Sequence, residues 1–299
     1  MNIRTVISGL RFPLYWASGG PIVISAALAI FLHDFTHPQL WAIGSCALFV
    51  FEIGVNLVAE VSDGMEGVTV TQSETWIPTG PYLLEKTGMP ARKLLMYGAA
   101  CFALSGIMGL YLASVTCFAV ILSLGAAGLI MTYVYAFPPI ELGFRGVGEP
   151  VPFLAFGPLP VIALFYLSTG GVLSTLPLLF SLPTAFWITA VRYAHHLPDE
   201  GHRRAKRYRK AYGARLAHAV PALTLLMGLA IVSTFLLYPF TGISVFLPLA
   251  VSVLISLNIV RLLHECQLNP VGISRLTSHF VALQFIGTLL IALALLVPV

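Results

Sequence analysis

Long apolar stretches recur along the whole chain and are separated by short polar segments. Each stretch is about 20 residues long, the length that an α-helix needs to cross roughly 30 Å of hydrocarbon. Because the apolar residues form continuous runs instead of alternating with polar ones, an outer-membrane β-barrel is excluded. The pattern predicts an all-α, polytopic membrane protein with about nine transmembrane helices, at residues 13–32, 40–59, 93–113, 115–136, 151–168, 175–193, 217–237, 244–263 and 280–298.

The composition supports this prediction. Of the 299 residues, 58% are hydrophobic and 9% are charged, whereas a soluble domain carries roughly 25% charged residues. A soluble globular protein is therefore excluded, and so is a disordered chain, which needs low hydrophobicity. The spacing of the four cysteines indicates neither a disulfide framework nor a zinc finger. We expect a single integral membrane domain over residues 1–299, with the first span retained instead of cleaved as a signal peptide.

The charged residues are divided unequally between the two ends of the predicted spans. When alternate span ends are assigned to the same face, all 16 Lys and Arg residues lie at one membrane face. By the positive-inside rule this face is cytoplasmic, so that the N-terminus lies inside and the C-terminus outside. All but two of the 12 acidic residues share this face, since Asp34 lies at the opposite face and Glu52 inside a span. Polar chemistry is therefore expected at the cytoplasmic face, which argues against a channel or an alternating-access transporter.

Acidic residues cluster toward the end of the second span, where residues 51–67 read FEIGVNLVAEVSDGMEG. At 100° per residue, one helical face carries Glu52, Asn56, Glu60, Asp63 and Glu66. Ionisable residues at membrane depth are costly and usually serve a function. The pattern favours a functional site, and the alternative is a solvated acidic turn that pairs with arginine from a neighbouring loop. For Glu52, a structural hydrogen bond between helices is an equal alternative.

A second polar loop follows the sixth span, where residues 191–204 read VRYAHHLPDEGHRR. A shift of 136 residues aligns Asp63 with Asp199, which indicates a weak internal repeat and two polar loops that face each other. Arg203 and Arg204 either bind a diphosphate or belong to the basic run that rests on anionic lipid. The histidines of this loop are either ordinary polar residues or ligands of a transition metal.

Several motifs lie within residues 11–213. The most specific block, 144–170, contains FRGVGE, FGPLPV and YLSTG. The acidic segment reads NLVAEVSDGMEG at 56–67, GPYLLEKTGMP follows at 80–90, and the first span begins with RFPLYWASGGPIV at 11–23. These motifs resemble those of the UbiA superfamily of intramembrane prenyltransferases, and most of all its menaquinone branch, the 1,4-dihydroxy-2-naphthoate polyprenyltransferases.

The resemblance implies a UbiA-type bundle and a reaction. In that family, two Asp-rich loops hold Mg²⁺ on the diphosphate of a polyprenyl donor, and an aromatic acceptor attacks the allylic cation. Mg²⁺ prefers oxygen ligands and would neutralise the leaving diphosphate. Matched by position, Asp63, Asp199 and Glu60 are the implied catalytic and metal-binding residues, with Glu200 as a further metal ligand. The implied substrate-binding residues are Asn56, Arg145, Glu149, His195, His196, Arg203 and Arg204.

The chain departs from the family's pattern at three places. Ala59 stands where the first motif has Asn, His195 and His196 stand where the second has an Asn pair, and Arg203 replaces its last Asp. An alternative register makes Glu200 the second acid. The set of acidic ligands is thus reduced, and a guanidinium at position 203 would repel a second Mg²⁺ and could bind the diphosphate directly.

Three hypotheses about function follow. The first is a Mg²⁺-dependent prenyltransferase that uses an isoprenyl diphosphate and a small, quinone-precursor-like aromatic acceptor. The second is a terpene cyclase on the same scaffold, which acts on the isoprenyl diphosphate alone, and the third is a non-catalytic isoprenoid-binding homologue. We expect the protein to reside in a prokaryotic inner membrane and to bind no nucleic acid, because the basic loop adjoins the membrane.

Overall fold

A computed structural model describes residues 15–32, 34–65, 81–136, 139–145, 148–195, 197, 218–265 and 270–297. Within these residues the regular structure is entirely helical. The helices are α2 (Trp16–Phe31), α3 (Pro38–Met65), α4 (Tyr82–Thr87), α5 (Ala91–Val115), α6 (Phe118–Ala136), α7 (Leu142–Arg145), α8 (Pro150–Ala155), α9 (Pro158–Ser168), α10 (Leu176–His195), α13 (Ala219–Phe235), α14 (Tyr238–Thr241), the 3₁₀ helix η2 (Gly242–Val245), α15 (Phe246–Glu265) and α16 (Pro270–Leu296).

The helices coincide with the apolar stretches that the sequence predicts. By length and hydropathy, six segments of the described chain can cross a membrane, and one of them, Ala219–Leu263, runs through α13 to α15. Ser18–Phe31 is a shorter apolar helix. The prediction of an all-α polytopic membrane protein is confirmed, whereas the count of nine spans stays a prediction.

The predicted span at 151–168 is broken into two helices, α8 and α9. Pro158 begins α9, and proline has no backbone N–H with which to continue a preceding helix. At Gly157, between the two helices, an added Cβ would overlap the Cβ of Ala185 in α10. The break therefore lets the backbone pass close to α10.

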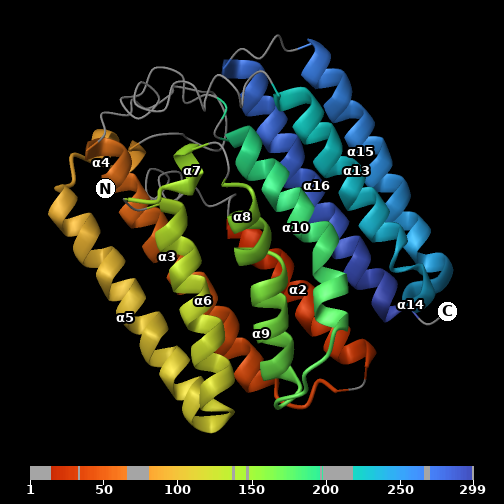
Figure 1. Ribbon diagram of the computed structural model, residues 1–299, viewed down its shortest axis with the longest axis horizontal. Coiled ribbons are helices and arrows are strands. Elements are labelled where there is room, and N and C mark those ends of the chain that lie inside the picture. Colours follow the sequence, from red (N-terminus) through yellow and green to blue (C-terminus); the bar gives the residue numbers. More distant parts are fainter. Residues whose placement is uncertain are drawn as a thin grey trace.

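The long helices form one bundle with two unlike sides (Figure 1). Helices α3, α5 and α6 lie along one side, α13, α15 and α16 lie along the other, and α2, α9 and α10 lie between them. The main hydrophobic core joins the central helices to α13–α16 and includes the fully buried Phe165, Phe180, Trp187 and Phe280. On the other side, no residue of α6 between Phe118 and Tyr135 is buried. The looser packing leaves room for a cavity on the side of α3, α5 and α6.

Candidate active site

A cavity of about 530 Å³ lies among α3, α5, α6, α8 and α9. Pockets for small molecules in proteins measure roughly 300–1,000 Å³. Along α6 the lining residues run from Ile121 to Tyr135, which corresponds to about 21 Å at roughly 1.5 Å per residue. The cavity is thus elongated along the helix axes.

The two ends of this cavity differ in polarity. At the deep end the walls are apolar and include Leu112, Ile121, Leu164 and Leu167. At the other end the lining includes Glu52, Thr132, Tyr135 and Arg192. This polar end lies toward the side of the bundle where α3, α6 and α10 terminate. A ligand with an apolar chain and a charged end matches this division.

Glu52 is the acidic residue at the polar end of the cavity, and it is only 3% exposed. Its Oε2 accepts a hydrogen bond from the hydroxyl of Ser18 in α2. Its Oε1 has no hydrogen-bond partner among the described residues, and neither does Nδ2 of Asn56 one turn further along α3. The interhelical hydrogen bond that the sequence left as one alternative is therefore present, and the second carboxylate oxygen remains available to a ligand.

Arg192 brings a positive charge to the same end of the cavity. Its guanidinium lies 5.0 Å from the centroid of the Phe156 ring and interacts electrostatically with Glu52. Its Nε has no hydrogen-bond partner in the described part of the chain. Sequence reasoning counted Arg192 only as a positive-inside residue and missed this placement. The available signal was the cost of a charge inside the last turn of an apolar helix.

Glu60 lies further along α3, and its side chain connects α3 to the short helix α4. Its Oε1 accepts hydrogen bonds from the backbone N–H groups of Leu83 and, at 3.4 Å, of Leu84. A carboxylate is favourable there because the first N–H groups of a helix have no partner within the helix. Leu84 also packs against Gly64 at the end of α3, where an added Cβ would lie 2.6 Å from Leu84 Cδ1. Glu60 thus has a structural task that the sequence did not indicate, and its role as a metal ligand stays a prediction.

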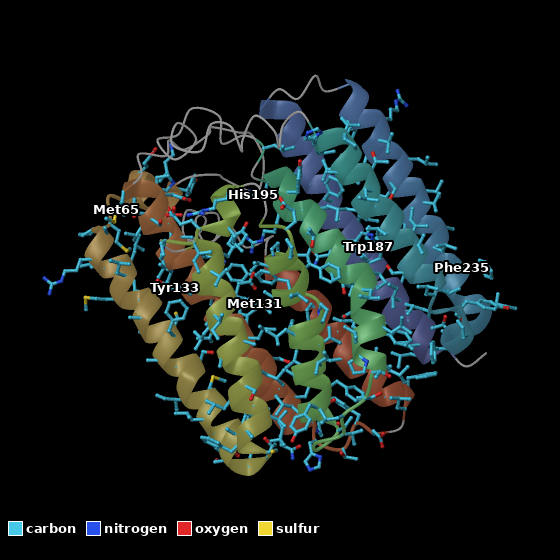
Figure 2. All side chains as sticks on the ribbon, viewed as in Figure 1. Met65, Met131, Tyr133, Trp187, His195 and Phe235 are labelled. Carbon is cyan, nitrogen blue, oxygen red and sulfur yellow. The ribbon has the colours of Figure 1, made fainter. Side chains whose placement is uncertain are left out.

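The remaining described candidates lie near the same end of the bundle. Asp63 is half-buried in the last turn of α3, one turn beyond Glu60. Arg145 is exposed, and its Nη2 donates a hydrogen bond of 2.6 Å to the carbonyl of Pro139. Glu149 is half-buried just before α8, and His195 is buried at the end of α10. Figure 2 shows Met65, the last residue of α3, and His195 at the same end of the bundle.

Part of the predicted site lies outside the described residues. These positions are Glu66, His196, Asp199, Glu200, Arg203 and Arg204. In the ranges that the structure does describe, no three His, Cys, Asp or Glu side chains form a group that could hold a metal ion. The assignments of metal-binding, catalytic and substrate-binding residues therefore stay predictions.

Comparison of the sequence with known proteins finds relatives among the phytyltransferases. No protein-family model matches the chain. A 2-carboxy-1,4-naphthoquinone phytyltransferase of Synechocystis sp. is 26% identical over 161 residues, which cover 54% of this chain and 50% of that protein. A chloroplastic 2-carboxy-1,4-naphthoquinone phytyltransferase of Arabidopsis thaliana is 46% identical over 46 residues, 15% of this chain and 12% of that protein. The chain spans about half the length of the Synechocystis protein and a smaller part of the Arabidopsis protein.

The fold has a counterpart among solved structures. A UbiA homologue from Archaeoglobus fulgidus, bound to GPP and Mg²⁺, superposes with a TM-score of 0.56 over 96% of this chain and 99% of that chain, at 14% identity. The chain therefore has a UbiA-type fold. The two named relatives are both naphthoquinone phytyltransferases, which agrees with the resemblance that the motifs of the sequence carry. In this UbiA-type bundle, the first acidic motif occupies the end of α3, and the segment that contains the second begins at the end of α10.

Proposed function

We propose that this protein transfers a polyprenyl group from an isoprenyl diphosphate to a small aromatic acceptor that resembles a quinone precursor. The observation that carries the proposal is the elongated cavity, with its apolar deep end and its polar end beside Glu52 and Arg192. An isoprenyl diphosphate has the same division between a long apolar chain and one charged end. The names of the two sequence relatives support the reaction class.

The cavity is also accessible from the side that would face lipid. Leu110 of α5 and Leu122 and Leu129 of α6 line it, yet each remains exposed on the surface. Apolar surface of this kind on a membrane protein is covered by lipid chains, because lipid is as apolar as leucine. A lipid-like donor can therefore reach the cavity from within the bilayer.

The proposed reaction replaces one bond of the donor with a bond to the acceptor. The bond between C1 of the chain and the diphosphate oxygen breaks, and the diphosphate leaves with the electron pair. A ring carbon of the acceptor bonds to C1, and the ring then loses its proton to restore aromaticity. The apolar walls of the cavity would keep water away from the allylic cation. Arg145, Arg203 and Arg204 are the proposed partners of the diphosphate.

We propose Mg²⁺ as the cofactor, held by Asp63 together with Asp199 or Glu200. The UbiA homologue of A. fulgidus is bound to GPP and Mg²⁺. Carboxylates suit this ion, which is usually held by one or two of them together with substrate phosphates. Asp63 fits the role because it is half-buried at a helix end. When bound, Mg²⁺ would neutralise the charge of the leaving diphosphate.

The placement in the membrane completes the proposal. We propose one domain over residues 1–299, with the active face and the N-terminus in the cytoplasm of a prokaryotic cell. The location of all 16 Lys and Arg residues at one predicted face supports this orientation. A cysteine-accessibility assay on intact cells, with single cysteines placed at Arg145 and at Asp34, tests it.

The function is tested with purified protein, Mg²⁺ and farnesyl or geranylgeranyl diphosphate, with and without 1,4-dihydroxy-2-naphthoate. We expect release of diphosphate and a prenylated naphthoate, both dependent on the acceptor and on Mg²⁺. Asp63→Asn should reduce the rate by at least about 100-fold, since even outer-shell partners of a metal contribute roughly 10–100-fold. Asp34→Asn is the matched control, because Asp34 precedes α3 at its opposite end.

Other outcomes distinguish the alternatives. Release of diphosphate without acceptor, together with a cyclic product, would establish a terpene cyclase instead. Binding of the donor without release of diphosphate, with Asp63→Asn equal to wild type, would identify a non-catalytic isoprenoid-binding protein.

A further inference from the structure

Four glycines on α5 and α6 line the middle of the cavity. Gly106 and Gly109 lie on α5, and Gly125 and Gly128 lie on α6. In each helix the two glycines are three residues apart and therefore share a face. A Cβ added to Gly106, Gly109 or Gly125 would meet no described atom within 4 Å, and one added to Gly128 would meet only Cδ2 of Leu159, at 3.7 Å. The cavity walls are thus bare backbone at these four positions.

Other glycines of the bundle are required by helix packing. An added Cβ on Gly54 of α3 would lie 2.9 Å from Cε1 of Phe102 in α5, and one on Gly287 of α16 would overlap the ring of Trp187. A side chain at either position would push neighbouring helices apart. The four cavity glycines have no such neighbour, so close helix packing does not require them. What depends on their small size is the width of the cavity.

A second, independent observation indicates that this cavity holds a ligand. Glu52 lines its polar end, is 3% exposed, and has an Oε1 atom without a hydrogen-bond partner among the described residues. A buried oxygen that no protein group satisfies costs free energy unless something else pairs with it. The cavity therefore combines an unsatisfied polar end with an apolar extension that passes the glycines.

Resting on the proposed function, we infer that Gly106, Gly109, Gly125 and Gly128 determine the length of the isoprenoid chain that the protein accepts. Gly128 and Gly125 lie seven and ten residues before Tyr135 at the polar end of α6. At roughly 1.5 Å per residue these separations are about 10 and 15 Å. On α5, Gly106 and Gly109 line the facing wall of the same cavity.

The length of an isoprene unit indicates which chains need the space beside the glycines. Each unit adds four bonds of roughly 1.5 Å to the chain and is therefore at most about 6 Å long. The first two units extend at most about 12 Å, past Gly128 but short of Gly125. A third and a fourth unit must pass Gly125 of α6 and the facing glycines of α5. Donors with three or four units therefore depend on the glycines in the middle of the cavity, and a donor with two units does not reach Gly125.

The inference is tested by filling the middle of the cavity. In Gly125→Leu and Gly109→Leu, the dissociation constant of geranylgeranyl diphosphate should rise by at least about tenfold, as expected from overpacking by one side chain. The constant of farnesyl diphosphate should rise less, and that of geranyl diphosphate should stay within about twofold of wild type. Gly125→Ala should show the same order of effects at smaller size, which keeps the test decisive if a leucine variant fails to fold.

Gly228→Leu is the matched control. Gly228 lies on α13, outside the cavity, and an added Cβ there meets no described atom within 4 Å. It should leave all three dissociation constants unchanged. Binding is measured directly on purified protein, and transfer to 1,4-dihydroxy-2-naphthoate is measured in parallel.

The two measurements separate this inference from the proposed function. In one outcome, the wild type binds the long donors but does not transfer them, and the cavity variants lose affinity for them. This would support the inference and refute the proposed function. In another outcome, the wild type transfers the donors, and the ratio of the dissociation constants of geranyl and geranylgeranyl diphosphate is the same in the variants as in wild type. This would overturn the inference and support the proposed function. A wild type that binds none of the three donors would overturn both.

Discussion

The hydrogen bond between Ser18 and Glu52 joins α2 to α3 in the interior of the bundle, and it can be tested with a double-mutant cycle. Ser18 is fully buried and Glu52 is 3% exposed, so that neither group can exchange its partner for bulk water. We consider Ser18→Ala, Glu52→Met and the combination of the two. Methionine is unbranched and adaptable, and it replaces the carboxylate with an apolar group of similar length.

The magnitudes follow from burial and from the number of unpaired atoms. Ser18→Ala removes a hydrogen bond to a carboxylate, which is worth about 1.5–3 kcal/mol. Glu52→Met leaves the hydroxyl of Ser18 buried and unpaired, at a cost of about 1–3 kcal/mol. The double variant leaves neither partner of this hydrogen bond unpaired and should lose less stability than the sum of the two single losses. A remaining loss is expected, because Arg192 no longer has the Glu52 charge beside it. At roughly 2–4 °C per kcal/mol for a protein of this size, Ser18→Ala should lower Tm by about 3–12 °C.

The assay is thermal unfolding of the four purified proteins in one detergent, followed by prenyl transfer at a temperature where all are folded. We expect the Tm of the double variant to lie above the value that the two single losses add up to, whereas activity is not recovered, because Glu52 Oε1 no longer lies at the polar end of the cavity. Additive losses of Tm in the two single variants, or a Ser18→Ala protein with unchanged Tm, would refute the coupling inferred between these side chains.

Three further substitutions test other parts of the structure. Glu60→Ala removes the acceptor for the N–H groups of Leu83 and Leu84 and should lower the free energy of unfolding by about 1–3 kcal/mol. Glu60→Gln keeps an acceptor oxygen and should lower the free energy of unfolding less. Equal Tm values for the two variants would contradict this role of Glu60. Gly157→Ala places a Cβ onto Ala185 and should destabilise by at least about 1–3 kcal/mol, so that an unchanged Tm would show that α9 and α10 are not in close contact. Arg192→Gln keeps hydrogen-bonding capacity but removes the charge beside Glu52, and it should raise the KM of a substrate more than it lowers Tm; the reverse pattern would show that its role is structural.

The fold was largely predictable because a membrane helix is determined locally. A run of about 20 apolar residues must become a helix in hydrocarbon, since an extended chain would leave its N–H and C=O groups unsatisfied there. For this reason the predicted apolar stretches coincide with helices. The break between α8 and α9 was not predicted, although Pro158 is a local signal for it. The close approach of Gly157 to Ala185 could not be predicted, because the two residues are far apart in the sequence.

The candidate site was predictable only in part. The spacing of Glu52, Asn56, Glu60 and Asp63 indicates a shared helical face, and the first three are in fact buried in α3. The spacing did not separate their tasks. One oxygen of Glu60 accepts hydrogen bonds from α4, and Glu52 bonds Ser18 of α2, and both contacts involve partners on other helices.

By itself, the sequence determined that the protein is a helical membrane protein, and its motifs indicated a resemblance to the UbiA superfamily and the end of the bundle where the candidate site residues gather. These properties depend on local hydrophobicity and on short motifs. Only the tertiary structure decided that Glu52 and Arg192 share one cavity and that four glycines leave its walls open. The reason is physical: a cavity is bounded by side chains from several helices, and the rotation and spacing of those helices are set by packing between residues that are distant in sequence.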